Sequence, residues 1–141
     1  MNAKLKKYMA DAIDNMISAG FQVKLIQNSS KYAGFLDEDG KVFSCQISEN
    51  PIDWFSDFVH EYCHFCQWKE KKYSGPKWMK SIEMVYSWVA GDISLSEKDR
   101  IYHINRCKRI ELDCEKRAVK EIKKYKLNIE RQEFLKRVGV L

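Results

Sequence analysis

Proline and glycine are scarce in this 141-residue sequence, at two and six residues, and this scarcity argues against disordered linkers. Long hydrophobic runs are also lacking. No stretch approaches the roughly 18 consecutive apolar residues that a membrane-spanning helix needs, so we expect no membrane partner. The apolar residues near the N-terminus are interrupted by Asp11 and Asp14, unlike a secretory signal. The length then predicts a single domain over residues 1–141.

Cysteine occurs an odd number of times, five, and no secretory signal accompanies it. Reduced thiols and a cytoplasmic location are therefore expected. The net charge is +5, with positive charge concentrated in residues 116–126. A basic helical face can contact nucleic-acid phosphates, but it can equally be a solvated face of Glu–Lys pairs.

Hydrophobic periodicity predicts an α+β fold in which a helix and a small antiparallel sheet precede a mostly helical half. The first half comprises a helix over residues 2–19 ended by Gly20, a strand over 21–26, a turn at 28–30, and a hairpin of 31–36 and 41–47. Gly40 is expected to supply a positive φ in that hairpin.

Four further helices are expected in the second half. They cover residues 52–72, 77–91, about 96–126 with Ser96 as the N-cap, and a short last segment beginning at Asn128.

Two of only three histidines occur in DFVHEYCHFCQW, residues 57–68. Residues four apart lie one turn apart on the same helix face, so His60 and His64 can bind one metal ion. Glu61 flanks that position and suits a general base. The alternative is an ordinary helix whose histidines are only hydrogen-bonded.

A third ligand is expected from RCKRIELDCEKRAVKEI, residues 106–122, where apolar residues share one helix face. Glu111 falls in the middle of that face, where a carboxylate is costly unless it is paired or binds metal. Glu115 lies one turn later, nearer the edge, and suits a group that orients a ligand histidine. Asp113 is predicted to face solvent.

HEYCH followed by ELDCEKRA resembles the gluzincin metallopeptidases, and the short chain is most similar to the ImmA/IrrE-like and phage-encoded minimal members. This resemblance implies one zinc per chain, held by His60, His64 and Glu111, with Glu61 as the catalytic glutamate. It also implies a bacterial or phage source, a peptide or protein substrate, and a hairpin strand that offers its edge to that substrate. The sequence departs from the compact members in a longer spacing between His64 and Glu111, which holds an extra apolar helix.

Several residues have more than one interpretation at this stage. His103 is either a replacement for Glu111, an oxyanion donor like Tyr102, or a surface residue. Asp53 and Asp57 either accept a hydrogen bond from a ligand histidine or are ordinary first-turn charges. Four cysteines could form a four-thiolate zinc site or be buried thiols of the core: Cys63, Cys66, Cys107 and Cys114.

The sequence therefore predicts a zinc-dependent metallopeptidase that hydrolyses peptide bonds. The alternative is a zinc-containing module that is catalytically silent and regulatory, or associated with nucleic acid through its basic helix.

Overall fold

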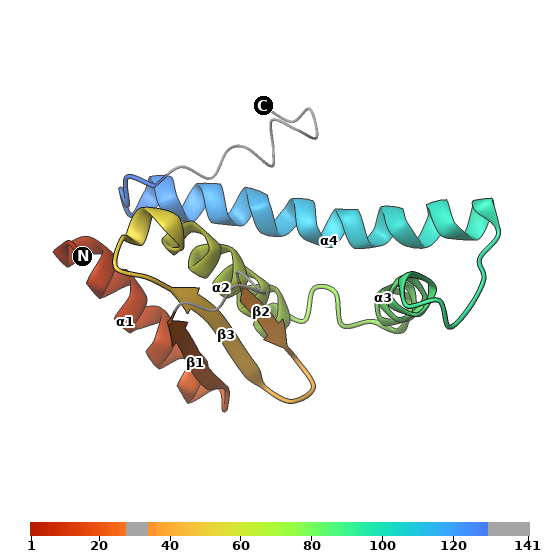
Figure 1. The fold of residues 1–141 in the computed structure, drawn as a ribbon, viewed down its shortest axis with the longest axis horizontal. Helices are drawn as coiled ribbons and strands as arrows, with labels where there is room; N and C mark the ends of the chain where they lie inside the picture. The colour runs from red at the N-terminus through yellow and green to blue at the C-terminus, as the bar shows by residue number, and fades with distance from the viewer. Residues whose placement is uncertain (28–33, 130–141) are drawn as a thin grey trace.

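The computed structural model describes residues 1–27 and 34–129 and has the predicted α+β class (Figure 1). Its elements are α1 (Ala3–Ser18), β1 (Gln22–Gln27), β2 (Gly34–Asp37), β3 (Val42–Ile47), the 3₁₀ turn η1 (Pro51–Asp53), α2 (Phe55–Glu70), α3 (Pro76–Val89) and α4 (Glu97–Lys124). The turn predicted at 28–30 lies outside the described residues, as does most of the segment predicted to be helical after Asn128. None of the described helices is long and apolar enough to cross a membrane.

Helix boundaries follow local chemistry that was visible in the sequence. Gly20 ends α1 with a φ of 90°, and Ser96 caps α4 by accepting a hydrogen bond from the Asp99 amide at 3.1 Å. The predicted start of α2 was three residues too early. Pro51–Asp53 forms a separate 3₁₀ turn, in which the Asn50 side chain accepts a bond from the Ile52 amide.

The sheet is mixed, which corrects the predicted antiparallel arrangement. Its strand order is β1-β3-β2, with β3 antiparallel to β2 but parallel to β1. The hairpin was predicted correctly for the described residues, and residues 31–33 of its predicted first strand lie outside them. Strand β3 lies between the other two strands and runs in the same direction as β1. Strand β2 is consequently an edge strand of this sheet.

The hairpin turn uses Gly40 differently from the prediction. The positive φ, 51°, falls on Lys41. The Gly40 amide donates to Asp37 Oδ1 at 3.0 Å, and a Cβ built on Gly40 would lie 2.5 Å from Asp37 Oδ2. A side chain at position 40 would therefore have to displace the Asp37 carboxylate, which folds back over the turn.

Helix α2 lies between the sheet and α4 and forms the centre of the core (Figure 1). Apolar side chains of α1, β3, α2 and the C-terminal half of α4 pack together here; the fully buried members include Met16, Phe43, Phe55, Phe58, Cys63 and Cys114. Because α2 is covered on two sides, any polar side chain on its buried faces needs a hydrogen-bond partner.

Helix α3 packs against the N-terminal half of α4, away from the sheet (Figure 1). We call α3 and residues 97–106 of α4 the arm. No residue of α3 belongs to the core cluster of the described chain. The arm is held by a buried hydrogen bond of 2.8 Å between Ser81 Oγ and His103 Nδ1, and Arg106 donates to the Lys77 carbonyl at 3.2 Å.

Candidate metal centre

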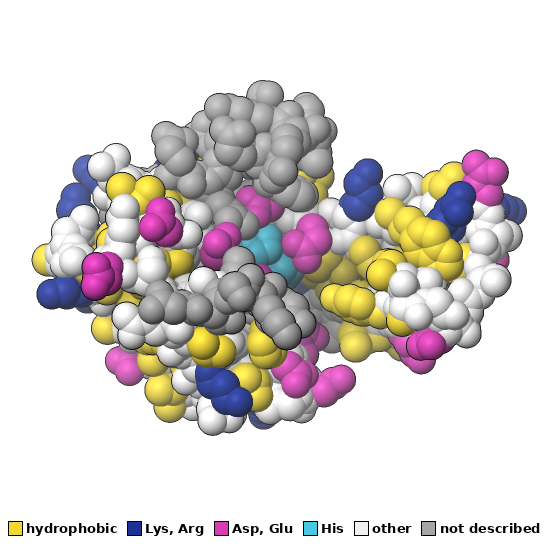
Figure 2. Space-filling model, viewed as in Figure 1, with side chains coloured by type: hydrophobic (Ala, Val, Ile, Leu, Met, Phe, Trp, Pro, Cys, Tyr) yellow, Lys and Arg dark blue, Asp and Glu magenta, His cyan; other side chains and the backbone are white. Residues whose placement is uncertain are grey.

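A cleft of about 580 Å³ lies between the arm and the sheet. Residues 34–39 of the hairpin line one side, apolar residues of α3 line the other, and side chains of α2 and α4 form the floor. Figure 2 shows histidine surface at the bottom of this hollow with acidic side chains around it. His60, Glu61, His64 and Glu111 all line it, so the structure brings these four predicted site residues together in one cleft.

The two imidazole rings lie on the same face of α2, as their spacing predicted, with centroids 4.8 Å apart. Their Nε2 atoms meet one carboxylate from α4. Glu111 Oε2 lies 3.3 Å from His60 Nε2, and Glu111 Oε1 lies 3.1 Å from His64 Nε2. Two imidazole nitrogens and one carboxylate therefore converge at the floor of the cleft.

The other nitrogen of each histidine is held from behind. His60 Nδ1 lies 2.5 Å from Glu115 Oε1, and the Glu115 side chain is only 1% exposed. His64 Nδ1 lies 2.9 Å from Gln67 Oε1. These contacts orient both rings so that Nε2 points toward Glu111, as partners behind metal-ligating histidines do.

Gln67 also determines the tautomer of His64. Its Nε2 donates to the Ile110 carbonyl at 3.0 Å and to Asp113 Oδ2 at 2.9 Å. With both amide protons used, Oε1 faces His64 and must accept, so His64 Nδ1 carries a proton. In the metal-free site, His64 Nε2 is then the atom that exchanges a proton with Glu111.

Asp113 does not face solvent as predicted. Besides Gln67, it contacts Lys72 Nζ at 3.2 Å and Arg117 Nε at 2.9 Å. Burial alone would raise the pKa of Asp113, but hydrogen bonds from Gln67, Lys72 and Arg117 outweigh it and lower the pKa. Asp113 is thus an ionised acceptor that secures the amide behind His64.

Glu111 and Glu115 have the reverse of their predicted burial. Glu111 is 48% exposed at the cleft, whereas Glu115 is almost fully buried. The sequence pattern predicted a buried face centred on Glu111. Helix α4 instead meets α2 through Cys114, Glu115 and Ala118, which are at most 1% exposed, so its buried face is centred about one turn later.

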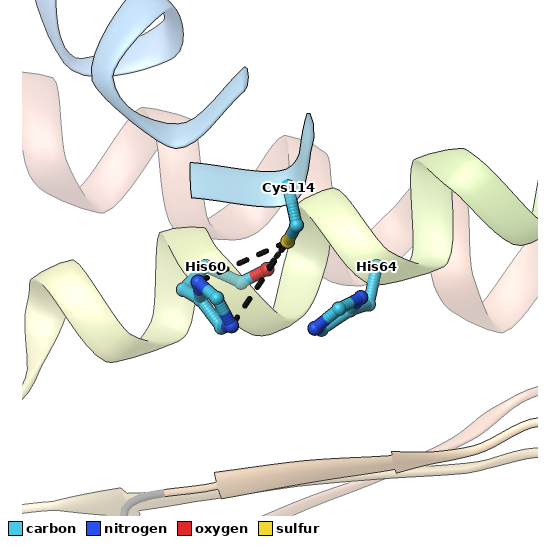
Figure 3. A group of neighbouring side chains, drawn as sticks. All are labelled: His60, His64 and Cys114. Atoms are coloured by element: carbon cyan, nitrogen blue, oxygen red, sulfur yellow. Dashed lines mark hydrogen bonds between the residues drawn. The ribbon is translucent and has the colours of Figure 1, made fainter. Parts of the chain in front are cut away.

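Cys114 is a further possible ligand, because its Sγ and a nitrogen of His60 and of His64 lie within 4.8 Å of one another. Figure 3 shows this thiol approaching His60 from the side of α4. Its Sγ is 3.8 and 4.0 Å from the two nitrogens of His60 and 3.1 Å from the His60 carbonyl oxygen. A sulfur nearly equidistant from both nitrogens lies along neither lone pair. Burial raises the pKa of this thiol, so it remains a protonated donor to the carbonyl.

The structure also locates the residues with open interpretations. His103 is buried against Ser81 in the arm, and neither it nor Tyr102 lines the cleft, so the ligand and oxyanion roles are not supported. Asp53 is exposed in the turn before α2, and the Nδ1 atoms of the site histidines contact Glu115 and Gln67. Cys63 is a core thiol, and no four-thiolate group occurs among the described residues.

Two residues near the site had not been predicted from the sequence. Gln67 had a usable signal, because it lies three residues after His64 and so on nearly the same face of the helix. Gly34 had none. A Cβ built on it would lie 2.9 Å from the Ser44 carbonyl and 3.0 Å from Glu61 Cγ, so β2 passes over the Glu61 side chain only because residue 34 has no side chain.

Comparison with protein-family models, with curated proteins and with solved structures finds no match for this chain. The resemblance to gluzincins accordingly remains a prediction from two sequence segments. The case for a metal site rests on the geometry of the side chains themselves.

The His64–Glu111 pair should make the stability of the metal-free protein depend on pH. Burial alone would lower the pKa of His64, but its hydrogen bond to Glu111 and the charge of Glu111 raise it. Burial alone would raise the pKa of Glu111, but hydrogen bonds to His60 and His64 lower it. The pair's contribution should be greatest between about pH 4.3 and 6.5, the unfolded values for Glu and His.

The contribution should decrease as the pH rises through the raised pKa of His64 and as it falls through the lowered pKa of Glu111. Urea unfolding of chelator-treated protein across this range measures the effect. Glu111→Gln should flatten the alkaline limb of the stability–pH curve, since the carboxylate that contributes most to raising the pKa of His64 is then gone. An unchanged alkaline limb in this variant would contradict the assignment.

Proposed function

We propose that this chain is a zinc-dependent peptidase whose metal is held by His60, His64 and Glu111. The observation that carries the proposal is the convergence of two Nε2 atoms on one carboxylate, at 3.3 and 3.1 Å, with both Nδ1 atoms held from behind. A structural zinc site is closed by four protein ligands, whereas a catalytic site uses three and leaves one position open. Two imidazoles and a carboxylate, arranged at the floor of an open cleft, match the second kind.

The donor chemistry favours Glu111 over Cys114 as the third ligand. Glu111 is ionised and contacts the Nε2 atom of each histidine. Cys114 is buried, its thiol is protonated, and it donates to the His60 carbonyl. Since a cysteine binds metal as a thiolate, this residue would have to lose both its proton and its hydrogen bond.

In hydrolysis, Glu61 would act as the general base. Zinc held by these three side chains would supply a Lewis acid that polarises the scissile carbonyl and activates water. Glu61, which lines the cleft next to His60, would take a proton from the attacking water and deliver it to the leaving nitrogen. His60 and His64, fixed by Glu115 and Gln67, would keep their Nε2 lone pairs directed at the metal throughout.

The substrate would bind as an extended strand along β2. Within the hairpin only β2 can pair with a further strand, because β3 is paired on both sides while β2 is an edge of the described sheet. Residues 34–36 of β2 line the cleft beside Glu61. Backbone hydrogen bonds to an edge strand would hold a peptide without requiring a particular sequence.

The nucleic-acid alternative has no contact in the described chain that favours it. Lys116, Lys120, Lys123 and Lys124 are exposed on α4, as a solvated helix face would be. The geometry of the cleft therefore favours the peptidase over the nucleic-acid alternative.

Zinc analysis should find about one zinc per chain, and His60→Ala or His64→Ala should abolish tight binding. Glu111→Gln should weaken zinc affinity much more than Cys114→Ser does. The Co²⁺-substituted protein should lack a thiolate-to-metal charge-transfer band. A strong band lost in Cys114→Ser would identify the thiol as the ligand instead.

The residues behind the histidines provide graded controls for the same measurement. Glu115→Gln and Asp113→Asn should each reduce zinc affinity within the range of about 10–100-fold that is usual for such partners, with Asp113→Asn at the lower end because it acts through Gln67. Asp11→Asn, an exposed substitution in α1, should leave zinc affinity unchanged. Equal affinity of Asp113→Asn and the parent would contradict the role given to Gln67.

Glu61→Gln should keep zinc and the fold but lower the rate of peptide hydrolysis by about 10²–10⁴-fold, because an amide cannot accept the proton of water. Cleavage of an unstructured protein such as casein, followed by mass spectrometry, measures this rate. A Glu61→Gln protein as fast as the parent would exclude Glu61 as the base.

Gly34→Ala should displace Glu61, since the added Cβ would lie 3.0 Å from Glu61 Cγ and 2.9 Å from the Ser44 carbonyl. Hydrolysis should fall about tenfold or more, while zinc content stays near one per chain. Gly75→Ala is the matched control, because its Cβ would meet only Trp78 Cδ1, at 3.8 Å. Parental activity in Gly34→Ala would show that β2 does not constrain Glu61.

A further inference from the structure

The apolar surface of α3 has no role in the core. Met79, Ile82, Val85 and Tyr86 recur at helical spacing and line the cleft, yet none belongs to the core cluster. The only fully buried residue of α3 is a serine, Ser81. An apolar helix face that lies outside the core, stays partly exposed and lines a cleft is typical of a binding surface.

This face is held in a defined position opposite the metal-site residues. The Ser81–His103 hydrogen bond and the bonds from Arg106 to Lys77 and Ser81 fix α3 on α4. The same helix α4 carries Cys107, Ile110 and Glu111 into the cleft. The apolar face and the site are therefore joined through one rigid element, and Figure 2 shows hydrophobic surface on that side of the hollow.

We propose that this face of α3 is the specificity wall of the cleft, which selects a bulky apolar side chain beside the scissile bond of an extended peptide. This inference rests on the proposed peptidase function and adds a substrate class to it. The opposite side of the cleft is β2, whose edge suits a peptide backbone. A peptide paired there has its backbone on the hairpin side and reaches α3 only through its side chains.

Two features of the cleft favour a peptide over other occupants. Its volume of about 580 Å³ is in the range of small-ligand sites and accepts a few residues, whereas a docked second protein needs a much larger surface. Asp37, Glu38 and Asp39 border it at the tip of the hairpin. These carboxylates would repel the phosphates of a nucleic acid.

The test separates binding preference from catalysis. Zinc-loaded Glu61→Gln protein, which retains the cleft, is used to select short random peptides from a display library. Bulky apolar residues should be enriched over alanine by about tenfold or more at one position, the scale expected for filling a hydrophobic pocket. Absence of any such position would overturn the inference.

Ile82→Ser should reduce this enrichment severalfold, whereas Val89→Ser should leave it unchanged. Val89 lies on the same helix but is 71% exposed and does not line the cleft. Neither residue is in the core, so both variants should unfold at the same temperature as the parent. Equal enrichment by the two serine variants would also overturn the inference.

The selected peptides are then incubated with the parent protein and zinc. Cleavage next to the apolar residue, slowed in Ile82→Ser but not in Val89→Ser, is the expected result. Selective binding without cleavage would refute the peptidase proposal and leave α3 as a peptide-selecting surface. Cleavage with no apolar preference would support the peptidase and refute the role of α3.

Discussion

The contact between Glu115 and His60 is the interaction on which the site depends. A carboxylate that is 1% exposed is costly unless it is paired, and its partner here is His60 Nδ1 at 2.5 Å. This contact joins the two central helices, α2 and α4, and sets the rotation of α4. One turn earlier on the same helix, Glu111 then lies in the cleft, opposite the Nε2 atoms of both histidines.

A second polar connection secures the other histidine and extends to the surface. His64 contacts Gln67, Gln67 contacts Asp113, and Asp113 pairs with Lys72 and Arg117. The two histidines are thus held by different means. His60 has a buried carboxylate, while His64 has a neutral amide whose orientation is determined by the charged groups behind it.

Helix α4 has two functions along its length. Its C-terminal half, with Cys114, Ala118 and Ile122, completes the core, and its N-terminal half carries the arm. The cleft exists because α3 packs on the half of α4 that extends beyond the sheet. Its two sides therefore differ in chemistry: the edge strand β2 of the described sheet lies on one side, and apolar side chains of α3 lie on the other.

The elements with strong local signals were predicted from the sequence. The spacing of His60 and His64 determines their shared face on any helix. Gly20 and Ser96 mark helix ends through backbone geometry that does not depend on the rest of the fold. Glu111 was placed beside the histidines for a reason that proved wrong, since it is half exposed. Its position depends on how α4 is rotated and placed along its axis against α2, which a helical wheel of α4 alone does not determine.

The sequence by itself determined the class of fold, the helices and the pair of histidines with an adjacent glutamate, because each depends on residues close together in the chain. Tertiary structure decided the parallel pairing of β1 with β3, the burial of Glu115 in place of Glu111, and the role of Asp113 behind Gln67. It also decided that Gly34 lies against Glu61. These contacts join residues from separate elements, and their geometry is set by how α2, α4 and the sheet pack together, which no local pattern encodes.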